Sequence, residues 1–223
     1  EVLFKSLVID GKPQLVYAVM ARPAAKGKYP GIVFYHGGSG YGSIKEAVKW
    51  AKRGYIAIAP DLPGIGNAKK CVHSVGVWKQ LPYSTARWYA KPNVTTSVLF
   101  DAEVAALQAY FLLAGQPDVI KDKIGITGVS WGGYTTTMIT GLLGARPAAA
   151  FSIYGAGWYD EGSVFQGALR RLKGGERKAW FDEYDAGRKA LNIKVPFYYA
   201  VAVRDFFFWP PSVNKSYKSI KAE

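Results

Sequence analysis

The sequence is poor in several residue types, and each shortage narrows what the chain can be. Its 223 residues include one cysteine, Cys71, so no internal disulfide can form. Asp and Glu number 16 against 29 Lys and Arg, which gives a formal net charge of +13. No apolar run reaches the roughly 18 residues that a membrane span needs, so we expect no membrane partner.

The excess of positive charge raises the question of an anionic partner. A basic surface is typical of proteins that bind nucleic acid or another anionic polymer. Here the lysines are spread along the chain, and the densest basic cluster, residues 170–178, has acidic residues among it. We therefore predict a solvated basic surface and no nucleic-acid partner, while an acidic ligand or an acidic segment of a longer chain stays open.

Sequence signatures of cofactors and of export are missing as well. There is no Cys/His cluster with metal-ligand spacing and no P-loop, and residues 37–42 do not form a dinucleotide-binding fingerprint, so we expect no metal and no cofactor. Residues 1–10 lack the pattern of a signal peptide. Because the chain starts without Met, a periplasmic or secreted location and a cytoplasmic one both stay open.

What is present is a globular composition with alternating strand and helix patterns. Hydrophobic residues make up 49% and charged residues 20%, as in soluble globular proteins. Residues 3–9 and 14–21 predict a hairpin joined by the Asp10-Gly11 turn. Further apolar runs predict strands over 31–35, 55–59, 123–127, 148–154 and 195–203. Helical patterns cover 44–53, 95–114 (capped by Thr95 or Thr96), the segment that follows Ser130 to about Leu143, and 212–220.

The most informative stretch is Gly128-Val129-Ser130-Trp131-Gly132, which separates a predicted strand from a predicted helix. A serine on such a sharp turn projects its hydroxyl away from the sheet, and the flanking glycines avoid clashes where backbones come close. The helix N-terminus behind Ser130 offers free N–H groups to a developing oxyanion. We predict a nucleophilic serine; the alternative is an ordinary glycine-rich turn that contains a serine.

A second glycine-rich turn, His36-Gly37-Gly38-Ser39-Gly40, follows strand 31–35. Glycines at this position let backbone N–H groups face a ligand, so Gly37 or Gly38 would provide the second donor of an oxyanion hole. The alternative is a flexible loop. His36 itself is predicted to fix the turn rather than to act as a base.

Asp205 follows strand 195–203, downstream of Ser130, where an orienting acid belongs in the order Ser, Asp, His. The alternative is a surface aspartate paired with Arg204, and Asp160 is the second choice for the acid. Asp61 is predicted to organise its own loop, and His73 is predicted to be a surface residue.

Two irregular segments, residues 67–93 and 155–191, are predicted as cap-like excursions from the sheet. The aromatic residues of 67–93 would line a carbohydrate or acyl pocket, or would simply pack a long loop.

Taken together, these features resemble the α/β-hydrolase superfamily over nearly the whole chain. Residues 54–64 and 128–134 look like the acetylxylan esterase, dienelactone hydrolase and prolyl-oligopeptidase-like branch. The resemblance implies a mostly parallel sheet between helix layers, with Ser130 as nucleophile and Asp205 as acid. It also implies an oxyanion hole made by the N–H groups of Trp131 and Gly38.

One departure concerns the catalytic histidine, which the resemblance places about 30 residues beyond Asp205. Residues 206–223 contain no histidine. We therefore expect 1–223 to be a single α/β-hydrolase domain truncated at its C-terminus, with the histidine and the last strand beyond residue 223.

The predicted activity is a serine hydrolase that cleaves a carboxylic ester through an acyl-enzyme. Aromatic residues and positive charge suit an acylated carbohydrate or a small ester as substrate. A prolyl-oligopeptidase-type peptidase, which would need a large gating domain, is an alternative, and a non-catalytic binding domain of the same fold is another. The oligomeric state stays open.

Overall fold

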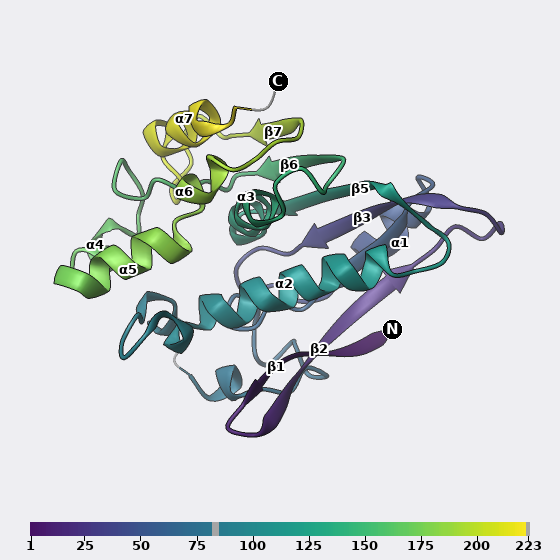
Figure 1. Cartoon of the computed structure of the whole chain (residues 1–223), viewed down its shortest axis with the longest axis horizontal. Coiled ribbons are helices and arrows are strands. Elements are labelled where there is room, and N and C mark those ends of the chain that lie inside the picture. The colour runs from purple at the N-terminus through teal and green to yellow at the C-terminus, as the bar shows by residue number, and fades with distance from the viewer. Residues whose placement is uncertain (82–84, 222–223) are drawn as a thin grey trace.

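A seven-stranded sheet forms the centre of the computed structural model, which describes residues 1–81 and 85–221 (Figure 1). The strand order is β1-β2-β4-β3-β5-β6-β7. The β1–β2 and β2–β4 pairs are antiparallel and the other four pairs are parallel, as the mostly parallel sheet predicted from the sequence requires. The strands are β1 (Val2–Ile9), β2 (Lys12–Ala21), β3 (Tyr29–Tyr35), β4 (Ile56–Pro60), β5 (Val119–Val129), β6 (Ala149–Ile153) and β7 (Phe197–Ala200).

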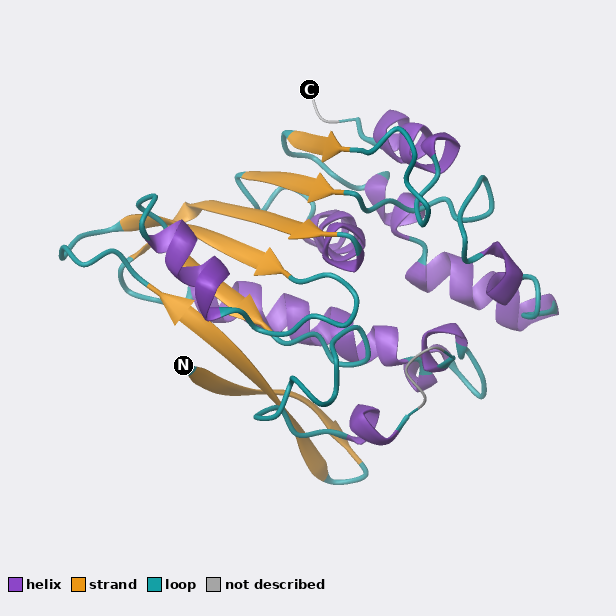
Figure 2. Ribbon diagram, turned by 180° about the vertical axis from the view of Figure 1, so that it is seen from behind, coloured by secondary structure: helices purple, strands orange, loops and turns teal. Residues whose placement is uncertain are grey.

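Helices cover both faces of the sheet. Helix α1 (Ile44–Ala51) lies on one face, and α2 (Val98–Ala114) and α3 (Trp131–Leu143) lie on the other, as the view from behind in Figure 2 shows. In the described parts of the chain, no helix combines the length and apolar character needed to cross a bilayer. The remaining helices are α4 (Gln166–Leu169), α5 (Gly174–Tyr184), α6 (Ala186–Ala190) and α7 (Pro210–Ser219).

The hairpin turn and the core follow directly from the sequence pattern. Asp10 and Gly11 have φ angles of 49° and 73°, which is the left-handed pair that a tight two-residue hairpin turn requires. The main core lies between the sheet and the α2/α3 layer. It includes the fully buried side chains of Tyr35 on β3, Ile58 on β4 and Met138 on α3.

Several predicted boundaries are wrong, among them the start of β5, which lies at Val119 instead of residue 123. Strand β7 ends at Ala200 instead of residue 203, and the Val203 side chain beyond it is 89% exposed. In the described chain β7 pairs with β6 alone, so no second neighbour extends it. Helix α2 begins after Ser97, whose Oγ accepts the N–H of Leu99 at 3.2 Å, rather than after Thr95 or Thr96.

The segments predicted as cap-like both lie beyond the carboxyl ends of the parallel strands (Figure 1). Residues 155–191 carry α4, α5 and α6, whereas residues 67–93 contain only short 3₁₀ turns among the described residues. Residues 82–84, including the aromatic Tyr83, lie outside the described part.

Candidate active site

Ser130 occupies a strained turn between β5 and α3. Its φ and ψ angles are 58° and −119°, in a region that a side-chain-bearing residue rarely adopts. The Ser130 N–H donates to the carbonyl oxygen of Ile153 on β6 at 2.7 Å, and its own carbonyl accepts the N–H of Tyr134 at 3.0 Å. These bonds hold the serine between the sheet and the first turn of the helix, so its backbone is fixed on both sides.

The two glycines that flank Ser130 in the motif have no room for a side chain. A Cβ at Gly132 would lie 2.0 Å from the carbonyl oxygen of Tyr35 on β3. A Cβ at Gly128 would lie 2.4 Å from the carbonyl oxygen of Gly132. The close approach of β3, β5 and α3 at this point therefore explains the spacing of the sequence motif.

The turn after β3 passes beside the serine. A Cβ at Gly37 would be 3.3 Å from the Ser130 Cβ, and the next residue, Gly38, is exposed. In the part of the chain that the structure describes, no hydrogen bond uses the N–H of Gly38 or of Trp131 as its donor. Both backbone groups that the sequence assigns to an oxyanion hole are therefore available to a ligand.

His36 holds this turn from inside. Its buried ring accepts the Leu62 N–H through Nε2 at 3.0 Å, and its Nδ1 lies 2.8 Å from the carbonyl oxygen of Gly37. Burial lowers the pKa of His36, which favours the neutral ring with the proton on Nδ1. Both ring nitrogens are thus engaged, and the imidazole is not positioned to take a proton from Ser130.

Asp61 has a similar structural part in the neighbouring loop. Its buried carboxylate accepts the N–H of Gly42 and the hydroxyl of Ser74, each at 2.6 Å. His73 is exposed, and its ring packs against Tyr17 with centroids 4.9 Å apart. Neither side chain lines the pocket that contains Ser130.

Asp205 lines the same pocket as Ser130, with a volume of about 220 Å³. Its Oδ1 accepts the backbone N–H groups of Phe207 at 2.7 Å and Phe208 at 2.9 Å. Among the described residues, Oδ2 accepts no hydrogen bond and the carboxylate has no ion pair with Arg204. The structure therefore brings Ser130 and Asp205 to one pocket, with one carboxylate oxygen held by the backbone.

Asp160, the second choice for the acid, lies elsewhere. It pairs with Arg188 at 3.7 Å and lines a different pocket. The other residues of the Ser130 pocket are Tyr154, Ala202, Phe207 and Phe208, and no pattern in the sequence points to Tyr154. The aromatic run 206–209 directly after Asp205 is the signal that could have pointed to the two phenylalanines.

An aromatic cluster packs behind the serine. The Trp131 ring is 5% exposed and lies with its centroid 5.1 Å from that of Phe165, 6.2 Å from Trp88 and 6.5 Å from Phe208. The guanidinium of Arg87 lies 4.8 Å above the Trp131 ring. Since Trp88 comes from residues 67–93 and Phe165 from 155–191, the cluster joins both cap-like segments to the first turn of α3.

Comparison with known proteins identifies the family of the chain. The profile of the dienelactone hydrolase family matches residues 16–223, which is most of the chain. The chain belongs to the dienelactone hydrolase family. No curated protein sequence matches it significantly.

Solved structures similar to this dienelactone hydrolase family member include two acetyl xylan esterases. The enzyme from Paenibacillus sp. R4 has a TM-score of 0.78 and 17% identity, covering 99% of this chain and 73% of that chain. Acetyl xylan esterase 1 from Thermoanaerobacterium sp. JW/SL YS485 has a TM-score of 0.78 and 19% identity, covering 100% of this chain and 78% of that chain. The acylaminoacyl peptidase of Pyrococcus horikoshii has a TM-score of 0.67 and 19% identity, and the match covers 99% of this chain and 34% of that chain.

These similarities confirm the α/β-hydrolase fold that the sequence resembles. Family membership places the chain among hydrolases. The particular ester or amide cleaved, and the parts taken by Ser130, Asp205, Trp131, Gly37 and Gly38, are matters for proposal.

Proposed function

We propose that this dienelactone hydrolase family member is a serine hydrolase that cleaves a carboxylic ester. The observation that carries the proposal is the strained Ser130 turn, whose side chain lines one pocket with Asp205. Ser130 attacks the acyl carbon and forms an acyl-enzyme, which water then hydrolyses. The N–H groups of Trp131 and of Gly38, or of Gly37 in its place, stabilise the oxyanion, each donor by roughly 3 kcal/mol.

The general base in this proposal is a histidine outside residues 1–223. Both histidines within the chain are placed elsewhere, since His36 uses its two ring nitrogens in its own turn and His73 lies on the surface. The Oδ2 of Asp205 is the group that would accept the N–H of an incoming imidazole and orient it. The hydrogen bonds from the backbone N–H groups of Phe207 and Phe208 to Oδ1 hold the carboxylate in one position.

The proposed substrate is an acylated carbohydrate or another small ester. Support comes from the similarity to two acetyl xylan esterases and from the aromatic cluster around Trp131. A prolyl-oligopeptidase-type peptidase is the second candidate, favoured by the similarity to an acylaminoacyl peptidase. A third candidate, a binding domain without activity, would have no use for an activated serine.

The test is reaction of the full-length protein with a fluorophosphonate probe, with the adduct located by mass spectrometry, beside hydrolysis of short acyl esters. We expect the adduct on Ser130. Ser130→Ala should abolish it and lower ester hydrolysis at least about a thousandfold. Ser6→Ala, on the remote strand β1, is the matched control and should leave both unchanged.

Other outcomes distinguish the candidates. A folded full-length protein that forms no adduct contradicts the enzyme and favours the binding domain. Cleavage of peptide amides faster than of matched esters favours the peptidase.

A further inference from the structure

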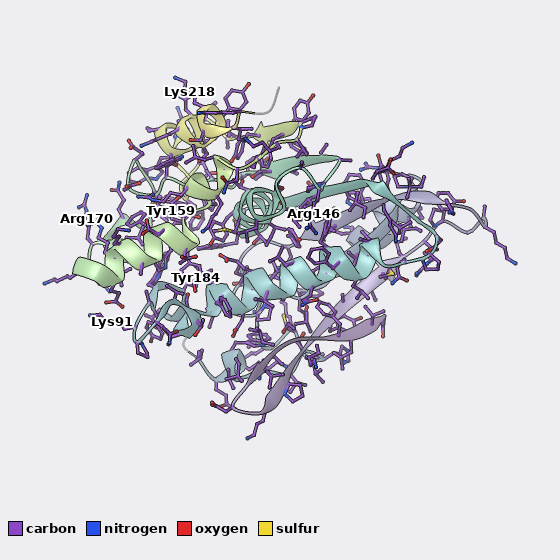
Figure 3. All side chains as sticks on the ribbon, in the orientation of Figure 1. Lys91, Arg146, Tyr159, Arg170, Tyr184 and Lys218 are labelled. Atoms are coloured by element: carbon purple, nitrogen blue, oxygen red, sulfur yellow. The ribbon has the colours of Figure 1, made fainter. Side chains whose placement is uncertain are left out.

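We propose that residues 155–191 carry a binding site for an oxoanion, either a carboxylate or a phosphate. The site is a pocket of about 110 Å³ whose polar lining is Asp160, Gln166, Arg170 and Arg177. Tyr159 and Arg170 lie in the α4–α6 part of the molecule, beyond the sheet (Figure 3). No residue lining this pocket also lines the Ser130 pocket, so the two sites are separate.

The acidic side chains of residues 155–191 form ion pairs with basic residues other than Arg170 and Arg177. Each of the six acidic side chains in 155–191 already has a basic partner. Among the described residues, neither Arg170 nor Arg177 has a carboxylate within ion-pair distance. The six pairs are Asp160–Arg188, Glu161–Lys215, Glu176–Lys91, Asp182–Lys178, Glu183–Lys189 and Asp185–Arg188.

The existing contacts of the two arginines do not use up their donors. Arg170 donates through Nη2 to Oε1 of Gln166 at 3.4 Å, and the guanidinium of Arg177 lies 5.4 Å from the ring centroid of Phe181. A guanidinium carries five N–H donors, and its fork matches the oxygens of a carboxylate or phosphate. Arg170 and Arg177 lie on different elements, so an anion between them would join the end of α4 to α5.

The Tyr159 side chain closes the inner side of the pocket and is 0% exposed. The charged groups that act on its buried hydroxyl are Asp185 and Arg87, outside the pocket. The donors that the pocket offers to an anion are therefore the guanidinium groups of Arg170 and Arg177.

The negative charge of one pocket residue, Asp160, disfavours the binding of an anion, and this allows a second test. Asp160 lines the pocket, and its carboxylate is held by Arg188 at 3.7 Å. Its negative charge weakens the attraction of the two arginines for an anion. Asp160→Asn should therefore tighten anion binding, which is the opposite of the effect expected for the arginine variants.

The pocket, with a volume of about 110 Å³, admits one carboxylate or phosphate group. The ligand is a free oxoanion or the acidic group of a larger molecule. Arginine pairs bind both kinds of group through charge-assisted bidentate hydrogen bonds.

The experiment is calorimetric titration of the full-length protein with inorganic phosphate and, separately, with glucuronate, at constant ionic strength set by chloride. We expect saturable binding of at least one of them, and this identifies the phosphate or the carboxylate as the preferred group. Arg177→Gln and Arg170→Gln should each weaken the affinity at least tenfold. Arg171→Gln removes the same charge from an exposed residue outside the pocket and should leave the affinity within twofold.

Absence of saturable binding by both ligands overturns the proposal. So does an equal loss in Arg171→Gln, because binding would then follow net charge alone. If Arg177→Gln does not fold, Arg177→Lys keeps the charge without the planar fork and should still bind more weakly than the wild type. Labelling of Ser130 by the fluorophosphonate should be unchanged in all these variants, so this proposal and the proposed hydrolase activity can fail independently.

Discussion

Among the described residues, five non-glycine residues have a positive φ angle: Asp10, Ser39, Ser130, Tyr154 and Trp158. Three of them surround the candidate site. Ser130 and Tyr154 line its pocket, and Ser39 follows Gly38 in the turn beside it. Such conformations cost free energy and persist where the surrounding fold imposes them. The positive φ angles of Tyr154 and Ser39 thus add to the strain at Ser130 in supporting the proposed site.

Asp101 is a residue whose burial predicts a pH dependence of stability. It lies in the first turn of α2 and is 6% exposed, and burial raises its pKa to about 7. In the unfolded chain the pKa of Asp101 is about 3.9, so between about pH 4 and pH 7 the folded state keeps a proton on this carboxyl that the unfolded state has lost. The free energy of unfolding should therefore fall as pH rises from about 4 to about 7.

Asp101→Asn removes this penalty while keeping the shape of the side chain. At pH 8 the variant should be more stable than the wild type by up to about 4 kcal/mol, because the folded and unfolded pKa values differ by about three and a difference of one corresponds to about 1.4 kcal/mol. Denaturant unfolding at pH 5 and pH 8 measures the difference, and the exposed Asp122→Asn is the control. A variant that is less stable than the wild type at pH 8 would show that the Asp101 carboxylate is needed for folding.

At the scale of elements, the start of α2 tests a boundary that the sequence misplaced. Ser97 caps the helix, whereas Thr95 and Thr96 lie in the preceding 3₁₀ turn, Val94–Thr96. Ser97→Ala should lower the free energy of unfolding by about 1 kcal/mol, the usual value of a side-chain cap. Thr95→Ala should cost less than Ser97→Ala in the same denaturant titration. Equal losses would contradict the assignment of Ser97 as the cap.

The sequence predicts elements well where the signal is local. The Asp10-Gly11 turn and the apolar runs of β3 to β6 need only neighbouring residues, and all are confirmed. The end of β7 depends instead on whether a second strand pairs with it. Likewise, the sequence predicts Thr95 or Thr96 as the cap of α2, whereas the structure has Ser97, whose hydroxyl also donates to the carbonyl oxygen of Arg87 at 3.0 Å.

In the candidate site, as in the fold, some features could be predicted from the sequence and others could not. The glycine spacing around Ser130 predicts the turn because G-x-S-x-G between a strand and a helix is a local pattern, although the contact that excludes a side chain at Gly132 is with the distant Tyr35 on β3. The backbone donors to Asp205, the positive φ of Tyr154 and the ring contact of Trp88 with Trp131 arise from long-range packing. No spacing in the sequence encodes such contacts, so they required the structure.

At the scale of the whole molecule, the net charge of +13 predicts a preference among substrates. A long-range positive potential raises the encounter rate with anions, and salt screens it, since the Debye length falls from about 30 Å at 0.01 M to about 10 Å at 0.1 M. For two esters with the same acyl group, the full-length enzyme should show a higher kcat/KM for the anionic one at low salt. The advantage should shrink as salt is added. Equal and salt-independent values would show that the charge does not guide substrate.

Ser130 is held by pieces of the chain that are far apart in sequence. Gly132 touches the end of β3 at Tyr35, the Ser130 N–H binds Ile153 on β6, and Asp205 comes only after β7. Parallel strand pairing of this kind forms slowly, because long loops must close before any contact is gained. During refolding, the helical signal should therefore recover before the serine can react with a probe. Reactivity at one atom then reports that the sheet has finished assembling.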